Sequence, residues 1–213
     1  MAKVMARATG ALLLAALLLA VSAEVDEEFL YVTCGSALKL THKATGAKLH
    51  SHEIPYGTGS GQQSVTGFPE NNDPNSYFAV DGGHGNPTCE RGVPIKCNSV
   101  VRLRHQLTGR LLHSHRHVAP LSGKQEVSCY GDWYNSDDGD NWIVECIDTA
   151  DTHWTREKGV RLKHKDTGLY LAIDARFRYS NPIPGQLEVH AKPRDANAIW
   201  MAMEGLYIAD KNY

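Results

Sequence analysis

The chain carries one sequence pattern three times. The segments ALKLTHKATGAKLHSH, VVRLRHQLTGRLLHSH and GVRLKHKDTGLYLAID align without a gap, with Leu40, Leu103 and Leu162 in register at intervals of 63 and 59 residues. A second anchor follows in each copy, as SGQQSV, SGKQEV and PGQLEV. Two anchors at similar offsets in three copies indicate an internal repeat, which constrains the fold more than any other feature of the sequence.

Each copy predicts four short β-strands. The alternating residues 37–40 and their equivalents predict a first strand, and the Thr-Gly pair that follows predicts a turn with glycine at positive φ. Residues 48–52 complete the hairpin, and the Gln-Val segment predicts a third strand. Residues 77–80, 141–144 and 199–203 predict the fourth strand of each copy. Three copies therefore give about twelve strands.

The repeats predict an all-β fold, a β-trefoil with pseudo-threefold symmetry. One copy has too few large apolar residues for a core of its own, so the three must pack as one domain. Threefold repetition with two hairpins per copy is the β-trefoil pattern, whereas propellers use about four to eight blades. We expect a signal peptide (1–23), an acidic segment (24–33), the domain (34–205) and a tail (206–213). Within the domain, the repeats are expected at about 34–90, 97–148 and 155–205.

The positions of the cysteines agree with this division into repeats. Cys34 precedes the first strand of copy one and Cys89 follows its fourth, while Cys97 and Cys146 bracket copy two in the same way. If the first and last strands of a copy are neighbours, each pair closes its own repeat. We therefore predict the disulfides Cys34–Cys89 and Cys97–Cys146, each worth about 2 to 4 kcal/mol. Cys129, inside copy two, is then the free thiol.

The N-terminus is typical of a cleaved signal peptide. Lys3 and Arg7 precede the apolar run ALLLAALLLAV, and the small residues after it predict cleavage between Ala23 and Glu24. This run is too short to span a bilayer and no later segment approaches that length, so we expect a secretory-pathway protein without a membrane span. The formal net charge of −2 provides no basic field for binding nucleic acid.

Two sets of histidines recur in the repeats. His42, His105 and His164 occupy the same position before each Thr-Gly turn, which favours a structural hydrogen bond at the hairpin.

The second set, the pairs His50–His52 and His113–His115, alternates with leucine and is expected on the outward face of its strand. With His117 at the next like-facing position, these histidines could bind a transition metal or a ligand. The alternative, which the missing third ligand favours, is that they cap the strand and hydrogen-bond a neighbouring loop. Copy three has Ala-Ile-Asp at the same place, so the fold does not require the pair.

Three further residues are candidates for a ligand or partner surface. Tyr56 and Gln62 lie in a glycine- and amide-rich loop that could hydrogen-bond sugar hydroxyls or a peptide backbone, and Trp133 could stack on a ligand. Catalytic motifs are lacking: the Asp-rich segment 137–141 does not have the ligand spacing of an EF-hand, and there is no nucleophile motif. We therefore predict no enzyme activity, no cofactor and no metal.

The repeat motifs resemble those of MIR-domain proteins, in particular the stromal cell-derived factor 2 and factor 2-like family. The resemblance is carried by KLHSHEIPYGTGSGQQSVTG, CERGVPIKC, GRLLHSHRHVAPLSGKQEVS and WMAMEG, and it extends over about residues 32–205. It implies a β-trefoil of three MIR repeats in the lumen of the endoplasmic reticulum.

The resemblance also implies a function and partners. It predicts a non-enzymatic accessory of a DnaJ-type co-chaperone and the chaperone BiP, acting in folding quality control and the unfolded-protein response on misfolded or O-mannosylated clients. The alternative is a lectin-like, glycan-binding module linked to protein O-mannosylation. The chain ends in LYIADKNY without the retrieval signal of many family members, so secretion is the alternative to retention in the lumen.

Overall fold

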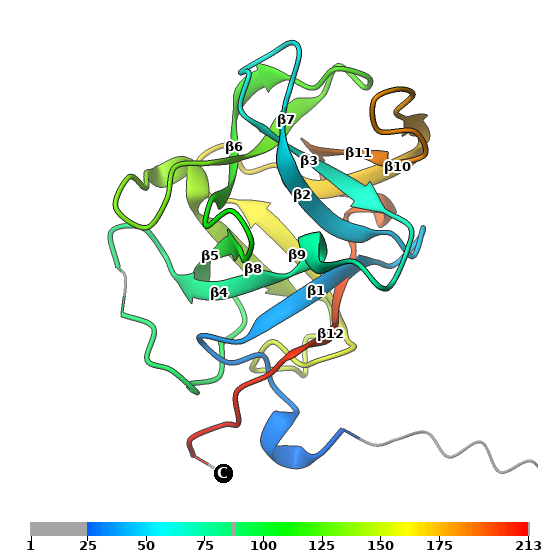
Figure 1. Ribbon diagram of the computed structural model, residues 1–213. Coiled ribbons are helices and arrows are strands. Elements are labelled where there is room, and N and C mark those ends of the chain that lie inside the picture. Colours follow the sequence, from blue (N-terminus) through cyan, green and yellow to red (C-terminus); the bar gives the residue numbers. More distant parts are fainter. Residues whose placement is uncertain (1–24, 87, 213) are drawn as a thin grey trace, which may run out of the picture.

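The computed structural model describes residues 25–86 and 88–212 (Figure 1). The predicted signal peptide and its cleavage position lie outside these residues. The twelve predicted strands are confirmed as β1 (Ala37–His42), β2 (Lys48–Pro55), β3 (Gln63–Phe68), β4 (Phe78–Gly82), β5 (Val100–His105), β6 (Leu111–Val118), β7 (Gln125–Tyr130), β8 (Trp142–Cys146), β9 (Gly159–His164), β10 (Tyr170–Arg178), β11 (Leu187–Lys192) and β12 (Trp200–Leu206). Short 3₁₀ turns are η1 (Glu27–Phe29), η2 (Pro74–Ser76), η3 (Asp138–Asp140) and η4 (Ala196–Ala198).

The first and fourth strands of each copy form a closed antiparallel barrel. Its pairings run β1–β4, β4–β5, β5–β8, β8–β9, β9–β12 and β12–β1. Closure leaves these strands without a free edge, which removes the aggregation hazard of an open sheet. The first and fourth strands of each copy are neighbours, which is the condition on which the predicted disulfides depend.

The second and third strands of each copy form three hairpins that cover one end of the barrel. In Figure 1 the hairpins β2–β3, β6–β7 and β10–β11 gather at the top, and the barrel lies below them. Their inner strands also pair with one another, as β3–β7, β7–β11 and β11–β3. A six-stranded barrel capped by a triangle of hairpins is the β-trefoil architecture, so the predicted fold class is confirmed.

One hydrophobic core joins the three copies. Leu40, Leu103 and Leu162, the leucines that define the repeat, are fully buried in it with Trp142 and Trp200. Because the residues of a strand alternate between faces, the pattern of inward leucines fixes the register of each barrel strand. No copy has a separate core among the residues described, apart from a small satellite cluster of Tyr170, Ala172 and Ala198 on copy three.

Both predicted disulfides are present. Cys34 bonds Cys89 and Cys97 bonds Cys146, with Cα–Cα distances of 5.6 Å in each pair. Cys129 is the free cysteine and is buried. Each disulfide joins the segment before the first strand of a copy to the segment at or after its fourth, so it closes a loop of sequence separation 55 or 49.

The ordered unit extends past the boundaries expected from the sequence. Val32, placed in the acidic segment, is fully buried in the core, and β12 runs to Leu206. Thr33 donates a hydrogen bond to the carbonyl of Ile208, and the amide of Asp210 donates to the carbonyl of Glu28. The two terminal segments therefore pack against each other at the open end of the barrel. No helix among the described residues is long and apolar enough to cross a membrane.

Candidate functional site

The hairpin histidines link neighbouring copies, which confirms their structural role. Nδ1 of His42, His105 and His164 lies 2.9 Å from the threonine hydroxyl of its own Thr-Gly turn. Nε2 contacts a backbone carbonyl in the 3₁₀ turn of the preceding copy, at 2.9 to 3.0 Å. Burial lowers the pKa of all three, so they are neutral near pH 7 and hold the copies together as hydrogen-bonding groups.

His50 belongs to a buried polar chain on copy one. Its Nδ1 lies 2.6 Å from Asp73, the residue that caps η2, and its Nε2 lies 2.8 Å from Nδ1 of His52. Burial lowers the pKa of His50 and lowers that of His52 to about 4. Burial favours the neutral acid at Asp73, but hydrogen bonds from Ser76 and His50 outweigh it and lower its pKa. A neutral His50 therefore donates to an ionised Asp73.

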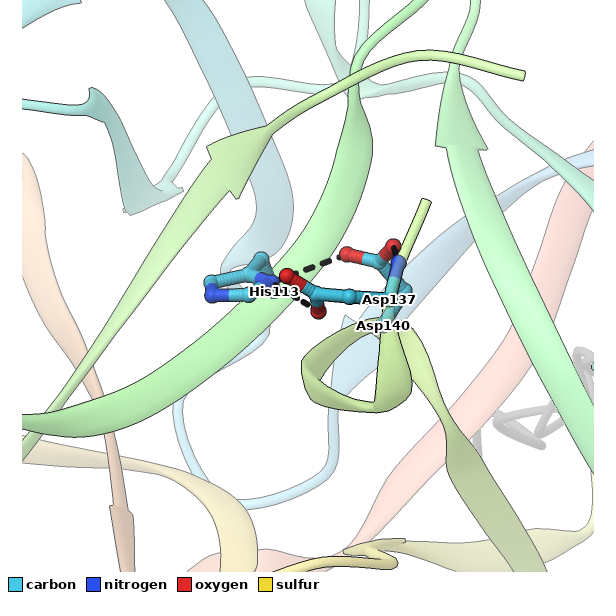
Figure 2. Close-up of side chains that lie close together, drawn as sticks. All are labelled: His113, Asp137 and Asp140. Atoms are coloured by element: carbon cyan, nitrogen blue, oxygen red, sulfur yellow. Dashed lines mark hydrogen bonds and ion pairs between the residues drawn. The ribbon is translucent and has the colours of Figure 1, made fainter. Parts of the chain in front are cut away.

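Copy two repeats this arrangement with different acids. Figure 2 shows His113 on β6 pointing at the η3 turn, where its Nδ1 lies 2.9 Å from Asp140 and 3.6 Å from Asp137. His115, whose ring centroid lies 5.1 Å from that of His113, contacts Glu126 on β7 at 2.9 Å. The centroid of the His115 ring also lies 4.5 Å from the centroid of the His117 ring.

The expectation that both histidine pairs lie outward is wrong for His50 and His113. Their side chains do project from the face of the strand that points away from the barrel. The turns η2 and η3 cover this outer face, so both histidines are buried, with exposed fractions of 4% and 5%. His52 and His115 are partly exposed. The alternative prediction, a hydrogen bond to a neighbouring loop, holds for His50 and His113. His52 and His115 instead contact the adjacent strand, at Ser64 on β3 and Glu126 on β7.

The side chains of the cluster in Figure 2 make the hydrogen bonds of the η3 turn. His113, Asp137 and Asp140 place three potential ligand atoms within 4.8 Å of one another. However, Asp140 bonds His113 through one oxygen and receives Ser136 and the Asp137 amide on the other, while Asp137 caps Gly139. A metal ion at this place would have to displace the hydrogen bond from His113 Nδ1 to Asp140, because a ring nitrogen that donates a hydrogen bond has no lone pair free for coordination.

Two buried glutamates, which the sequence did not single out, tie each copy to the hairpin of the copy before it. Glu126 accepts from the amide and hydroxyl of Ser60 at the β2–β3 turn, and Glu188 accepts from the amides of Leu121 and Ser122 at the β6–β7 turn. Both carboxylates are fully buried. Burial raises the pKa of Glu126, but hydrogen bonds from His115 and Ser60 outweigh it.

The signal for these glutamates is present in the sequence. An acid in the middle of an apolar strand occurs twice at one repeat position, where copy one has Ser64. Buried acids are rare unless they are paired, so this recurrence predicts a structural or functional role.

Tyr56 does not contribute to a ligand surface. Its side chain is buried among the three hairpins, and its hydroxyl lies 3.0 Å from the carbonyl of Val65 and 2.9 Å from that of Val127. The glycine-rich sequence suggested an open loop, but the chain turns the tyrosine inward, where its hydroxyl satisfies backbone groups of two copies. Gln62 is half-buried and lines a polar hollow with Arg110 and Tyr130.

Trp133 lies on an exposed aromatic surface of copy two. We define this aromatic surface by Trp133 and Tyr134, which line one hollow and have exposed fractions of 47% and 91%. The guanidinium of Arg102 lies 4.7 Å from the centre of the Trp133 ring and supports it by a cation–π contact.

A hollow of about 580 Å³ lies beside this surface. It is lined by Trp133, Tyr134 and Asp132 together with Asp81 and Arg104, which form an ion pair at 2.8 Å. Large exposed aromatic groups beside paired charges are typical of recognition sites.

The fold and the interlocked copies define the chain as a β-trefoil of the MIR type. Residues 49–176 match the MIR domain family. Mouse stromal cell-derived factor 2-like protein 1 is 48% identical over 178 residues, which cover 83% of this chain and 78% of that protein.

Solved structures agree with this match. The crystal structure of the SDF2-like protein from Arabidopsis thaliana is 44% identical, with a TM-score of 0.82, and covers 85% of this chain and 99% of that one. A protein O-mannosyltransferase complex from S. cerevisiae, bound to its sugar donor, is 27% identical over 91% of this chain and 29% of that chain, with a TM-score of 0.73. The chain belongs to the MIR-domain family of stromal cell-derived factor 2 and its like-proteins.

Proposed function

We propose that this protein is a non-enzymatic accessory subunit of a chaperone complex in the lumen of the endoplasmic reticulum, with a DnaJ-type co-chaperone and BiP as partners. The observation that carries the proposal is identity of 44 to 48% to SDF2-like proteins over most of the chain. Two disulfides that close the repeats support an oxidising compartment.

The distribution of polar groups supports a binding role. The buried carboxylates of Asp73, Asp140, Glu126 and Glu188 are all committed to turns and histidines that hold the trefoil together. A catalytic acid or base needs a reachable proton-transfer partner, and these groups face protein instead of a cleft. The aromatic surface, by contrast, leaves its side chains exposed. We propose it as the contact site for the co-chaperone.

Binding of purified components tests the contact site. The double variant Trp133→Ala/Tyr134→Ala should weaken binding to the co-chaperone at least tenfold by biolayer interferometry, because exposed aromatic residues carry much of the energy of an interface. Leu206→Ala removes an apolar side chain that is 75% exposed on β12, outside the aromatic surface, and serves as the control. Equal binding by the double variant would place the contact elsewhere.

A glycan-binding role is the second candidate, and the hollow beside Trp133 favours it. One face of the indole is covered by Arg102, and the Asp81–Arg104 pair supplies hydrogen-bonding groups at its side. A sugar ring stacked on Trp133 would change the intensity or the wavelength of its fluorescence. Titration with mannosides checks this candidate; no signal on a glycan array or in the titration would reject it.

A further inference from the structure

Copy three keeps a buried imidazole but moves it to the opposite strand. In copy one His50 pairs across the hairpin with Thr66, and in copy two His113 pairs with Ser128. In copy three the small residue is Ala172 on β10 and the histidine is His190 on β11. Directly paired residues have Cβ atoms only about 5 Å apart, so the ring fills the same part of the outer face. Along β10 alone, Ala172 therefore stands where the other two copies have histidine.

The acid that meets this imidazole in the other copies is missing from copy three. Asp73 holds His50 at 2.6 Å and Asp140 holds His113 at 2.9 Å. In the aligned η4 turn, Ala198 stands at the Asp140 position. Asp195 stands at the Asp73 position, where it pairs with Lys192 instead of with His190. Among residues 25–86 and 88–212, the carboxylate beside His190 is that of Glu188 on its own strand, and none comes from η4.

An open hollow of about 420 Å³ lies over this position, and its charged lining is mainly basic. We call it the copy-three hollow; its cations are Lys124, Arg176, Lys192 and Arg194. Its acids are Asp174 and Asp195, which pair with Arg176 at 2.5 Å and with Lys192. Lys124 and Arg194 have no ion-pair partner among residues 25–86 and 88–212, so the lining has two uncompensated positive charges.

His190 lies in the lining of the hollow and is almost completely buried, with an exposed fraction of 1%. Its Nδ1 lies 3.3 Å from Glu188 but makes no hydrogen bond of acceptable geometry. Glu188 is itself buried and committed to the amides of Leu121 and Ser122, at 2.6 and 3.1 Å. A buried polar atom without a hydrogen bond is costly, so the site gains from a ligand that reorients or engages the ring.

We propose that the copy-three hollow binds a phosphate group. Copies one and two show what this part of the fold accommodates, because each places an anionic oxygen against its buried imidazole. In copy three Glu188 lies 3.3 Å from His190 Nδ1, and a ligand oxygen would approach the ring from the hollow, where the free charges of Lys124 and Arg194 would neutralise it. Two uncompensated cations match a doubly charged phosphate better than a singly charged carboxylate, and Arg and Lys are the usual phosphate-binding side chains.

An NMR titration of the ¹⁵N-labelled chain tests this proposal. Inorganic phosphate and O-phosphoserine, added at constant ionic strength, should shift the amide signals of residues 122–124, 174–177, 190–192 and 194–195. The variant Lys124→Gln/Arg194→Gln should weaken binding at least tenfold. Lys165→Gln, which removes an exposed lysine outside the hollow, should leave it unchanged. If only O-phosphoserine shifts these amide signals, the hollow binds phosphorylated side chains and not free phosphate, a result that supports the proposal.

Three results would overturn the proposal. Shifts spread over the surface, equal binding by the double variant, or equal binding of acetate would each show that the hollow does not select phosphate. Because all substituted side chains are exposed, the variants should keep the wild-type circular dichroism spectrum, which separates loss of binding from loss of folding.

Discussion

His50 on β2 and Asp73 at the start of η2 lie 2.6 Å apart, and both are almost completely buried. The contact fastens the hairpin cap of copy one to the turn that leads into its barrel strand. Copy two repeats it with His113 and Asp140. These imidazoles therefore stabilise the joint between the cap and the barrel, and replacing them should change folding.

Removing the Asp73 carboxylate tests how much the His50–Asp73 contact contributes to the free energy of unfolding. Asp73→Ala leaves His50 Nδ1, the Ser76 hydroxyl and the Asn75 amide without their acceptor. We expect a loss of about 2 to 4 kcal/mol in the free energy of unfolding, measured by urea denaturation. Asp132→Ala also removes a carboxylate that accepts from its own loop, but on the surface, and it should leave the midpoint near wild type. Equal midpoints for both variants would show that the buried contact is not stabilising.

Mild acid should destabilise the protein. Burial lowers the pKa of His50, and lowers that of His52 from 6.5 to about 4. Between these values the unfolded chain binds more protons than the native one, so the free energy of unfolding falls as pH falls from about 6.5 to 4. Allowing for solvent screening, His52 contributes on the order of 1 kcal/mol to the loss between pH 7 and pH 5.

Urea midpoints measured at pH 7, 6 and 5 check this dependence. The variant His52→Gln should have a shallower decline than wild type, because the glutamine does not titrate. A wild-type midpoint that stays constant from pH 7 to pH 5 would contradict the expectation.

Two glycine variants test the contact between Glu126 and the β2–β3 turn, because both glycines have the same φ. Gly59 and Gly46 both have φ of 71°, so alanine is strained equally at either position. A Cβ at Gly59 would overlap the carboxylate of Glu126, whereas Gly46 has nothing within 4 Å. Gly59→Ala should lower the free energy of unfolding by roughly 1 to 3 kcal/mol more than Gly46→Ala does. Its melting temperature should be lower as well. Equal losses would show that the turn moves away from Glu126 at little cost.

Cys129 is expected to be unreactive in the native protein. Burial raises the pKa of its thiol to about 12, so almost none of it is thiolate near pH 8. A thiol-specific reagent without reductant should label no cysteine in buffer and one in 8 M urea, because the other four are in disulfides. Rapid labelling of the native chain would place Cys129 at the surface.

The repeat predicted the architecture because its determinants are local. Alternation and the Thr-Gly turns specify each hairpin within about 16 residues, and the position of a strand in its copy specified the disulfides. The environment of His50 depends on Asp73, 23 residues downstream, and on the path of the turn between them. Strand alternation indicates which face a side chain leaves from, but it does not show that another segment covers that face.

The third copy illustrates the same limit. Ala172 and His190 are neighbours only through the pairing of β10 with β11, so an alignment of β10 with β2 and β6 shows a lost histidine. The inward turn of Tyr56 likewise depends on carbonyls of two other strands, Val65 and Val127. Both features become visible once the register of the hairpins is known.

Quantitative mass spectrometry of the complex purified natively from endoplasmic reticulum lumen, through a tag on this chain, tests the proposed function most directly. We expect a DnaJ-type co-chaperone and BiP to be enriched far above their level in a purification of an unrelated tagged lumenal protein, and Trp133→Ala/Tyr134→Ala to reduce the recovery of both. Recovery of neither chaperone above that control would contradict the proposed function.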